Sequence, residues 1–146
     1  MGADCRAALR VGVRDRGVSA LHDATEGGVL GGLLEVAHAC GHALVVERDR
    51  IPLGPEARAA CAEFGSDPYW TLSEGTLIAT VRPRQAAAVL GALAEAGIAA
   101  AEVGEVAPGE GALRLVGPDG AVRVLTKPEP DPYWPAYARA VAEGWD

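Results

Sequence analysis

Two spacings of apolar residues alternate along the chain. Short apolar runs are typical of strands, whereas apolar residues three and four positions apart are typical of one face of a helix. The short runs predict strands at 18–21, 43–47, 76–81, 98–106, 113–116 and 122–125, and the wider spacing predicts helices at 4–16, 29–41, 55–64, 83–96 and 133–143. Strands that alternate with helices and end in a hairpin predict an α/β fold, with helices layered on a mixed β-sheet.

Glycine and proline residues mark the ends of these predicted elements. Gly41 and Gly65 follow predicted helices, at the position where a left-handed backbone ends a helix. Pro55 stands at a first helical position, where proline is favoured. The GPDG turn at 117–120 joins two short apolar runs and predicts a hairpin. No repeat and no internal boundary is visible, so we expect residues 1–146 to form a single domain.

The most informative stretch is HDATEGG at 22–28, which lies between a predicted strand and a predicted helix. The first turn of a helix has unpaired N–H groups and a positive partial charge, so it favours an anion. Gly27 and Gly28 allow a ligand or another backbone to approach closely. Asp23 could hold a metal-bound phosphate, and Thr25 could donate its hydroxyl to an anion. Alternatively, both side chains only cap the helix.

An acidic residue before a later strand is a second candidate. Glu74 and Gly75 immediately precede the strand predicted at 76–81. If this strand is the neighbour of the first one, Glu74 reaches the same edge as Asp23. A solvated turn is the alternative for these residues.

The histidines and cysteines give no metal or nucleophile pattern. His38 and His42 have the four-residue spacing of zinc ligands on a helix, but Gly41 is expected to end the helix between them. No further ligand motif accompanies them, and the cysteines have no catalytic partner pattern. We therefore expect no metal site, and a contact between a histidine and the helix end instead.

Composition and charge restrict the range of partners. Hydrophobic residues make up 49% of the 146 residues and charged residues 23%, which is ordinary for a soluble globular domain. The net charge of −7, without a basic run, argues against nucleic acid and anionic membranes as partners. No apolar run is long enough to span a membrane, and three widely spaced cysteines fit the reducing cytoplasm. A phosphate ligand would therefore need backbone amides, a metal ion or another polypeptide.

Aromatic residues are scarce, at 5% of the chain. The core must therefore consist mainly of alanine, valine and leucine. The pairs Tyr69-Trp70 and Tyr133-Trp134 either fill gaps in this core or face a partner surface.

Several motifs in this order resemble the C-terminal domain of the AIR synthase-related superfamily. That superfamily includes aminoimidazole ribonucleotide synthase (PurM), formylglycinamidine synthase (PurL), selenophosphate synthetase, thiamine-monophosphate kinase and the hydrogenase-maturation protein HypE. The pattern is most similar to HypE-like members: HDATEGG at 22–28, a helix, a strand, Ile51-Pro52, a second helix, and Glu74-Gly75 before an apolar strand. The resemblance extends over residues 4–126.

The resemblance implies a fold like the PurM C-terminal domain and an ATP-dependent enzyme that activates an amide or carboxyl oxygen by phosphorylation. It also implies an N-terminal domain, absent from these residues, that dimerises and carries most of the acids that bind ATP and Mg²⁺. The C-terminal domain would close the nucleotide and substrate cleft, with Asp23, Thr25, Gly27 and Gly28 lining it and Glu74 supporting it. We expect the isolated domain to be inactive, and its partners to be an N-terminal domain or dimer partner and a small-molecule substrate.

Two departures from the HypE pattern narrow this expectation. Glu26 stands where HypE often has arginine, which weakens direct attraction for phosphate. The residues EGWD at 143–146 lack the terminal cysteine on which HypE chemistry depends. The resemblance therefore favours a HypE-like protein of unassigned substrate, whose catalytic residues the sequence does not identify. The alternative is a non-catalytic module of the same fold that binds a small anion or another protein.

Overall fold

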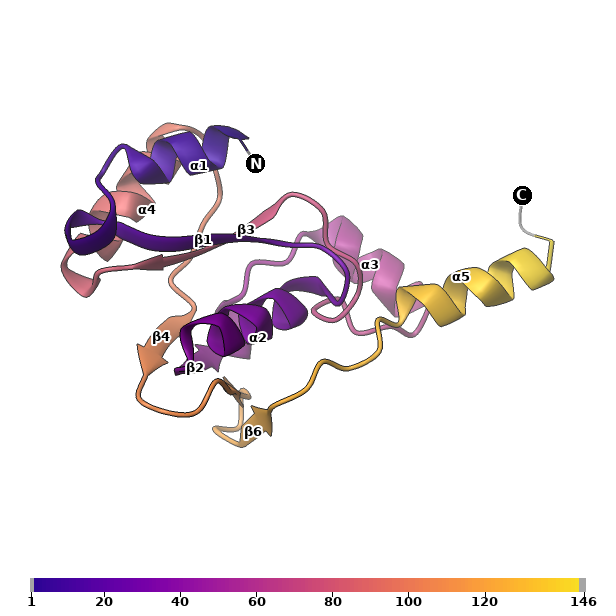
Figure 1. The fold of residues 1–146 in the computed structure, drawn as a ribbon. Helices are drawn as coiled ribbons and strands as arrows, with labels where there is room; N and C mark the ends of the chain where they lie inside the picture. Colours follow the sequence, from indigo (N-terminus) through magenta and orange to yellow (C-terminus); the bar gives the residue numbers. More distant parts are fainter. Residues whose placement is uncertain (1, 145–146) are drawn as a thin grey trace.

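The computed structural model describes residues 2–144, in which helices and strands alternate as the sequence predicts (Figure 1). In chain order the elements are α1 (Gly2–Leu9), β1 (Val18–Ala24), α2 (Gly28–Cys40), β2 (Ala43–Glu47), α3 (Pro55–Glu63), β3 (Thr76–Val81), α4 (Ala86–Glu95), β4 (Gly104–Ala107), β5 (Leu113–Val116), β6 (Val122–Leu125) and α5 (Tyr133–Ala142). Three short 3₁₀ helices are η1 (Arg14–Arg16), η2 (Arg48–Arg50) and η3 (Pro83–Gln85). The predicted α/β class is confirmed.

The strands divide between two sheets, although the sequence suggested one. β1 and β3 pair as an antiparallel ribbon, with Asp23 opposite Leu77 and Ala24 opposite Thr76. The larger sheet has the strand order β4-β2-β5-β6. It is mixed, as expected, because β2 runs parallel to β5 and antiparallel to β4. β5 and β6 form the predicted hairpin around 117–120.

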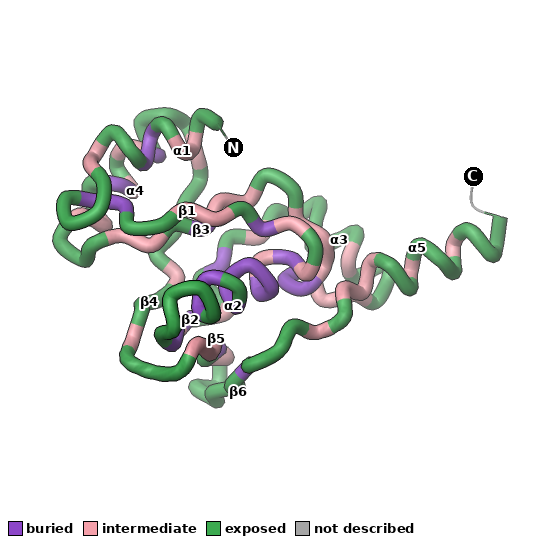
Figure 2. The backbone as a smooth tube through the Cα atoms, viewed as in Figure 1, coloured by how far each residue is buried: buried purple, intermediate pink, exposed green. Residues whose placement is uncertain are grey.

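Helix α2 lies between the ribbon and the larger sheet, which explains why it is apolar around most of its surface. Most of α2 is buried (Figure 2). Its buried side chains share one cluster with Ala24 and Ile78 of the ribbon and with Leu44 and Leu113 of the larger sheet. Gly32 permits this close packing, because a Cβ there would lie 2.9 Å from the Ile78 Cδ1 atom. A second cluster joins α1 and α4 to the other end of the ribbon. The candidate site lies where the ribbon leads into α2.

The helix predicted at 4–16 is shorter than expected. It ends at Leu9, and the chain then turns at Gly12, whose φ of +137° is accessible to glycine and not to a helical residue. The Gly12 carbonyl accepts a hydrogen bond from the Val18 N–H at 2.9 Å, which leads the chain directly into β1.

The strand predicted at 98–106 is also wrong over most of its length. Only Gly104–Ala107 pairs, as the edge strand beside β2. Ile98 instead packs against the cluster of α1 and α4, and residues 99–102, which follow it, form no strand. Gly104 begins the strand where backbones approach very closely, since a Cβ there would lie 2.0 Å from the Val45 carbonyl oxygen.

Helix α5 projects away from the rest of the molecule, and none of its residues is buried (Figures 1 and 2). The Tyr69-Trp70 pair is buried in the main cluster, whereas Trp134 is 52% exposed. Tyr69 and Trp70 therefore fill the core, whereas Trp134 is left exposed and a partner surface for the second pair stays a prediction. Among residues 2–144, no helix is both long and apolar enough to cross a membrane.

Candidate functional site

β1 continues through two residues that the sequence analysis placed in the turn. His22 and Asp23 pair with Ile78 and Leu77 of β3, so both have extended backbones. Side chains alternate along a strand, and these two therefore point to opposite faces of the ribbon. His22 lies on the α2 face, where its Nε2 donates to the Glu35 carboxylate at 2.7 Å. Asp23 is exposed on the other face and has no hydrogen-bond or ion-pair partner in the described part of the chain.

Backbone contacts, and not side-chain caps, shape the turn at 25–28. Gly27 and Gly28 have φ values of +78° and +63°, which favour glycine. The Thr25 carbonyl accepts hydrogen bonds from the N–H groups of Gly28 and Ser73, each at 3.1 Å. Neither Asp23 nor Thr25 makes a side-chain hydrogen bond to α2 within the described residues, so the capping alternative is wrong.

The loop at 69–71 packs against the first turn of α2. The Leu30 N–H donates to the Tyr69 carbonyl at 3.0 Å, which satisfies one of the unpaired donors of the helix. A Cβ on Gly28 would lie 2.5 Å from that carbonyl oxygen and 2.6 Å from the Thr71 carbonyl oxygen. The close approach expected at Gly28 is therefore made by the chain's own backbone.

A carboxylate lies at the start of α2. Asp131 Oδ2 accepts a hydrogen bond from the Gly27 N–H at 2.9 Å, and its Oδ1 accepts one from the Tyr133 N–H at 2.8 Å. The Val29 N–H, in the same helical turn, has no acceptor among residues 2–144. A negatively charged oxygen is favoured here by the helix dipole. No signal in the sequence points to Asp131, because 104 positions separate it from Gly27 and no local pattern links them.

The other predicted site residue, Glu74, lies at the same end of the ribbon as Asp23. The pairing of Ala24 with Thr76 brings the end of β1 beside the residues that precede β3. Glu74 is exposed and, like Asp23, has no partner in the described chain. Two carboxylates suit Mg²⁺, but no group of three His, Cys, Asp or Glu side chains among residues 2–144 could hold a metal ion. The ribbon end alone therefore does not make a complete Mg²⁺ site.

The histidines near the end of α2 bond to backbone carbonyls. His38 Nε2 donates to the Thr126 carbonyl at 3.2 Å, and His42 Nδ1 donates to the Cys40 carbonyl at 2.8 Å. Gly41, with φ of +66°, ends the helix between them as predicted. Both histidine side chains therefore make hydrogen bonds within the fold.

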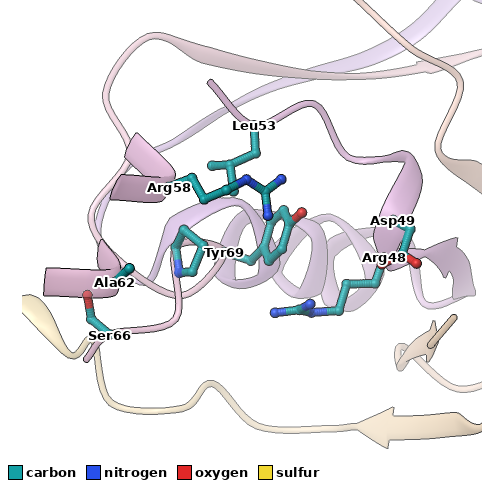
Figure 3. A pocket seen from close by; sticks show the side chains of 8 residues that line it. Arg48, Asp49, Leu53, Arg58, Ala62, Ser66 and Tyr69 are labelled. Carbon is teal, nitrogen blue, oxygen red and sulfur yellow. The ribbon is translucent and has the colours of Figure 1, made fainter. Parts of the chain in front are cut away.

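A cavity of about 450 Å³ lies beside the loop that contains Tyr69 (Figure 3). The Arg48 guanidinium stands 4.4 Å from the centroid of the Tyr69 ring and pairs with the Asp67 carboxylate at 3.1 Å. Figure 3 shows Arg58 of α3 reaching toward the same ring. Sequence spacing did not reveal this arrangement, because its residues come from different elements. Its charges largely compensate one another, which favours a role in holding the loop against α2.

Residues 3–116 match the family described as AIR synthase related protein, C-terminal domain. The chain belongs to this family. The AIR synthase-related chain is 38% identical over 118 residues to the carbamoyl dehydratase HypE of Escherichia coli, and the match covers 80% of this chain and 35% of that protein. The crystal structure of E. coli HypE superposes with a TM-score of 0.72 and 36% identity, over 84% of this chain and 38% of that one. A crystal structure of HypE in complex with ATP gives a TM-score of 0.73 and 28% identity, over 85% and 38% of the two chains.

These similarities confirm that the protein is a HypE-like, AIR synthase-related C-terminal domain. The chain spans about a third of the length of the curated HypE proteins it matches, 35% in the E. coli case. The ribbon end, the 25–28 turn and Glu74 all lie within the matched residues, whereas Asp131 and α5 lie beyond them.

Proposed function

We propose that this domain is the C-terminal part of an ATP-dependent, HypE-like enzyme. Its ribbon end and the start of α2 close a nucleotide and substrate cleft formed with an N-terminal domain, and the reaction activates an amide or carboxyl oxygen by phosphorylation. Asp23, Thr25, Gly27 and Gly28 line this cleft, and Glu74 supports it. The observation that carries the proposal is that two carboxylates without partners among residues 2–144, those of Asp23 and Glu74, lie at the end of the ribbon from which the chain enters α2.

The chemistry of phosphoryl transfer explains why such an edge needs a second domain. Catalysis of this transfer depends on positioning the phosphates and neutralising their charge. The Val29 N–H at the start of α2 has no acceptor among residues 2–144 and can hold a phosphate oxygen, and Mg²⁺ can bind Asp23 and Glu74 together with further ligands. Exposed Glu26 and the net charge of −7 oppose unaided phosphate binding. A similar HypE has been crystallised with ATP, and this chain covers 38% of that protein.

The test compares ATP turnover and calorimetric ATP binding for the 146-residue chain alone and together with a matching N-terminal domain. We predict background turnover for the isolated chain and measurable turnover after reconstitution. In the reconstituted protein, Asp23→Asn should lower turnover by at least about tenfold, because the amide is a weaker Mg²⁺ ligand than the carboxylate and lost support of a metal site costs about 10–100-fold in activity.

Asp119→Asn is the matched control, because Asp119 is also an exposed carboxylate but lies in the β5–β6 hairpin. It should leave turnover unchanged. Robust ATPase activity of the isolated chain would contradict the proposal. Full activity of the reconstituted Asp23→Asn protein would remove Asp23 from the cleft.

The second candidate is a non-catalytic module of the same fold that binds a small anion or another protein. The exposed aromatic residues of α5 favour this function. It predicts that turnover stays at background with the N-terminal domain present, while the chain still elutes in a complex. Turnover that appears on reconstitution would exclude it.

A further inference from the structure

The segment that joins β6 to α5 runs along the whole of α2 (Figure 1). At the end of α2, His38 Nε2 donates to the Thr126 carbonyl, and at its start the Gly27 N–H donates to the Asp131 carboxylate. A helix rises about 16 Å from Gly27 to His38, and an extended proline-rich chain covers about 16 Å from Thr126 to Asp131. Residues 126–132, named here the C-terminal strap, therefore cross α2 from end to end.

Among residues 2–144, few contacts hold the C-terminal strap in place. Besides the two hydrogen bonds to α2, Arg123 forms an ion pair with Glu129, and the Arg123 side chain is 61% exposed. Leu125 is the last buried residue up to position 144, and α5 buries none. Segments with few buried apolar contacts open at a low free-energy cost. The strap can therefore leave α2 while both apolar clusters stay intact.

Asp131 presents to α2 the same chemistry as a ligand phosphate oxygen: a negative oxygen that accepts a backbone N–H at a helix start. We propose that the C-terminal strap is an autoinhibitory contact, in which Asp131 occupies the anion position at the start of α2 and excludes a ligand phosphate. This inference rests on the function proposed above for that position. Release of Asp131 exposes the Gly27 N–H next to the unpaired Val29 N–H.

The test follows the Gly27 amide signal of the 146-residue chain by nitrogen–proton correlation NMR during titration with inorganic phosphate. Asp131→Ala should bind phosphate about tenfold more tightly than the native chain, the change expected when one charge-assisted competitor is removed. Asp131→Asn keeps an acceptor but loses the charge, so its affinity should lie between the two. Without phosphate, the Gly27 signal should already move in Asp131→Ala, because its acceptor is lost.

Glu143→Gln is the matched control, because it removes one negative charge after α5 without a contact to α2. Its phosphate affinity should equal that of the native chain. Equal affinity of the native chain and Asp131→Ala, including no binding by either, would overturn the proposal. An unmoved Gly27 signal in phosphate-free Asp131→Ala would overturn it too. These outcomes are separate from ATP turnover after reconstitution, whose failure would instead remove the proposed function of the cleft.

Discussion

Gly28 occupies a position that is both conformationally restricted and crowded. Its φ is +63°, and a Cβ there would lie 2.5 Å from the Tyr69 carbonyl oxygen. We predict that Gly28→Ala lowers the free energy of unfolding by about 3 kcal/mol, because left-handed strain and displacement of the loop add to each other. Urea unfolding monitored by tryptophan fluorescence measures this loss, since Trp70 is buried in the same loop.

Gly41 is the matched control for this substitution. Its φ of +66° is similar, but no atom of the described residues lies within 4 Å of a Cβ built there. Gly41→Ala therefore carries only the backbone strain, which costs about 1 kcal/mol. Equal losses for the two variants would show that the loop at 69–71 does not restrict Gly28.

At the residue scale, a site residue can be predicted from the sequence only where a charged side chain stands beside a turn residue. Asp23 and Glu74 could be named because each lies near glycine at the edge of a strand. The face to which Asp23 points depends on its pairing with Leu77, which the strand pattern alone leaves undetermined. Asp131 could not be named at all, because its contact with Gly27 depends on the path of the whole C-terminal strap.

At the element scale, α4 contains a glycine that is not required by its surroundings. A Cβ at Gly91 would meet no atom of residues 2–144 within 4 Å, and the Gly91 backbone is helical. We predict that Gly91→Ala raises the free energy of unfolding by about 0.5–1 kcal/mol, because alanine restricts the unfolded chain and favours the helix. The midpoint of urea unfolding measures this gain.

Gly32 in α2 provides the comparison. A Cβ there would lie 2.9 Å from Ile78 and 3.3 Å from the Ala24 side chain, so crowding should offset the helical gain of Gly32→Ala. Gly91→Ala should therefore be the more stable variant. The reverse order would show that α4 packs more tightly than the open space at Gly91 indicates.

At the element scale, the predicted strands have the right bounds where turn residues stand on both sides of an apolar run. The strands at 43–47 and 76–81 and the hairpin strands have the predicted bounds, because dense apolar runs stand between turn residues. The strand predicted at 98–106 is wrong before Gly104, because the alanine and valine residues there suit a strand but have no neighbouring strand to pair with. Pairing is a property of the sheet, and no local pattern encodes which neighbour is available.

At the scale of the whole molecule, α5 presents an apolar face to solvent. Trp134, Tyr137 and Val141 are 52%, 53% and 55% exposed, and their three- and four-residue spacing places them on one side of the helix. We predict that the 146-residue chain self-associates through this face, because burying large apolar side chains is favourable. Size-exclusion elution should therefore shift with protein concentration.

Combined Trp134→Ser and Tyr137→Ser should remove that concentration dependence. Val13→Ser is the control, because Val13 is also 52% exposed but lies far along the chain from α5. It should elute like the native chain. Elution that is independent of concentration in the native chain would show that the α5 face does not pair with itself.

The central strand of the larger sheet also has a consequence for synthesis of the protein. Within residues 2–144, β2 pairs only with β4 and β5, and both begin at or after Gly104. During synthesis, β2 with its apolar Leu44 and Val46 therefore leaves the ribosome long before β4 or β5 is available to pair with it. The ribbon of β1 and β3, complete at Val81, is available earlier. Nascent chains stalled between these two points would hold a formed ribbon beside an unpaired apolar strand, the form in which chaperones and proteases would meet this protein.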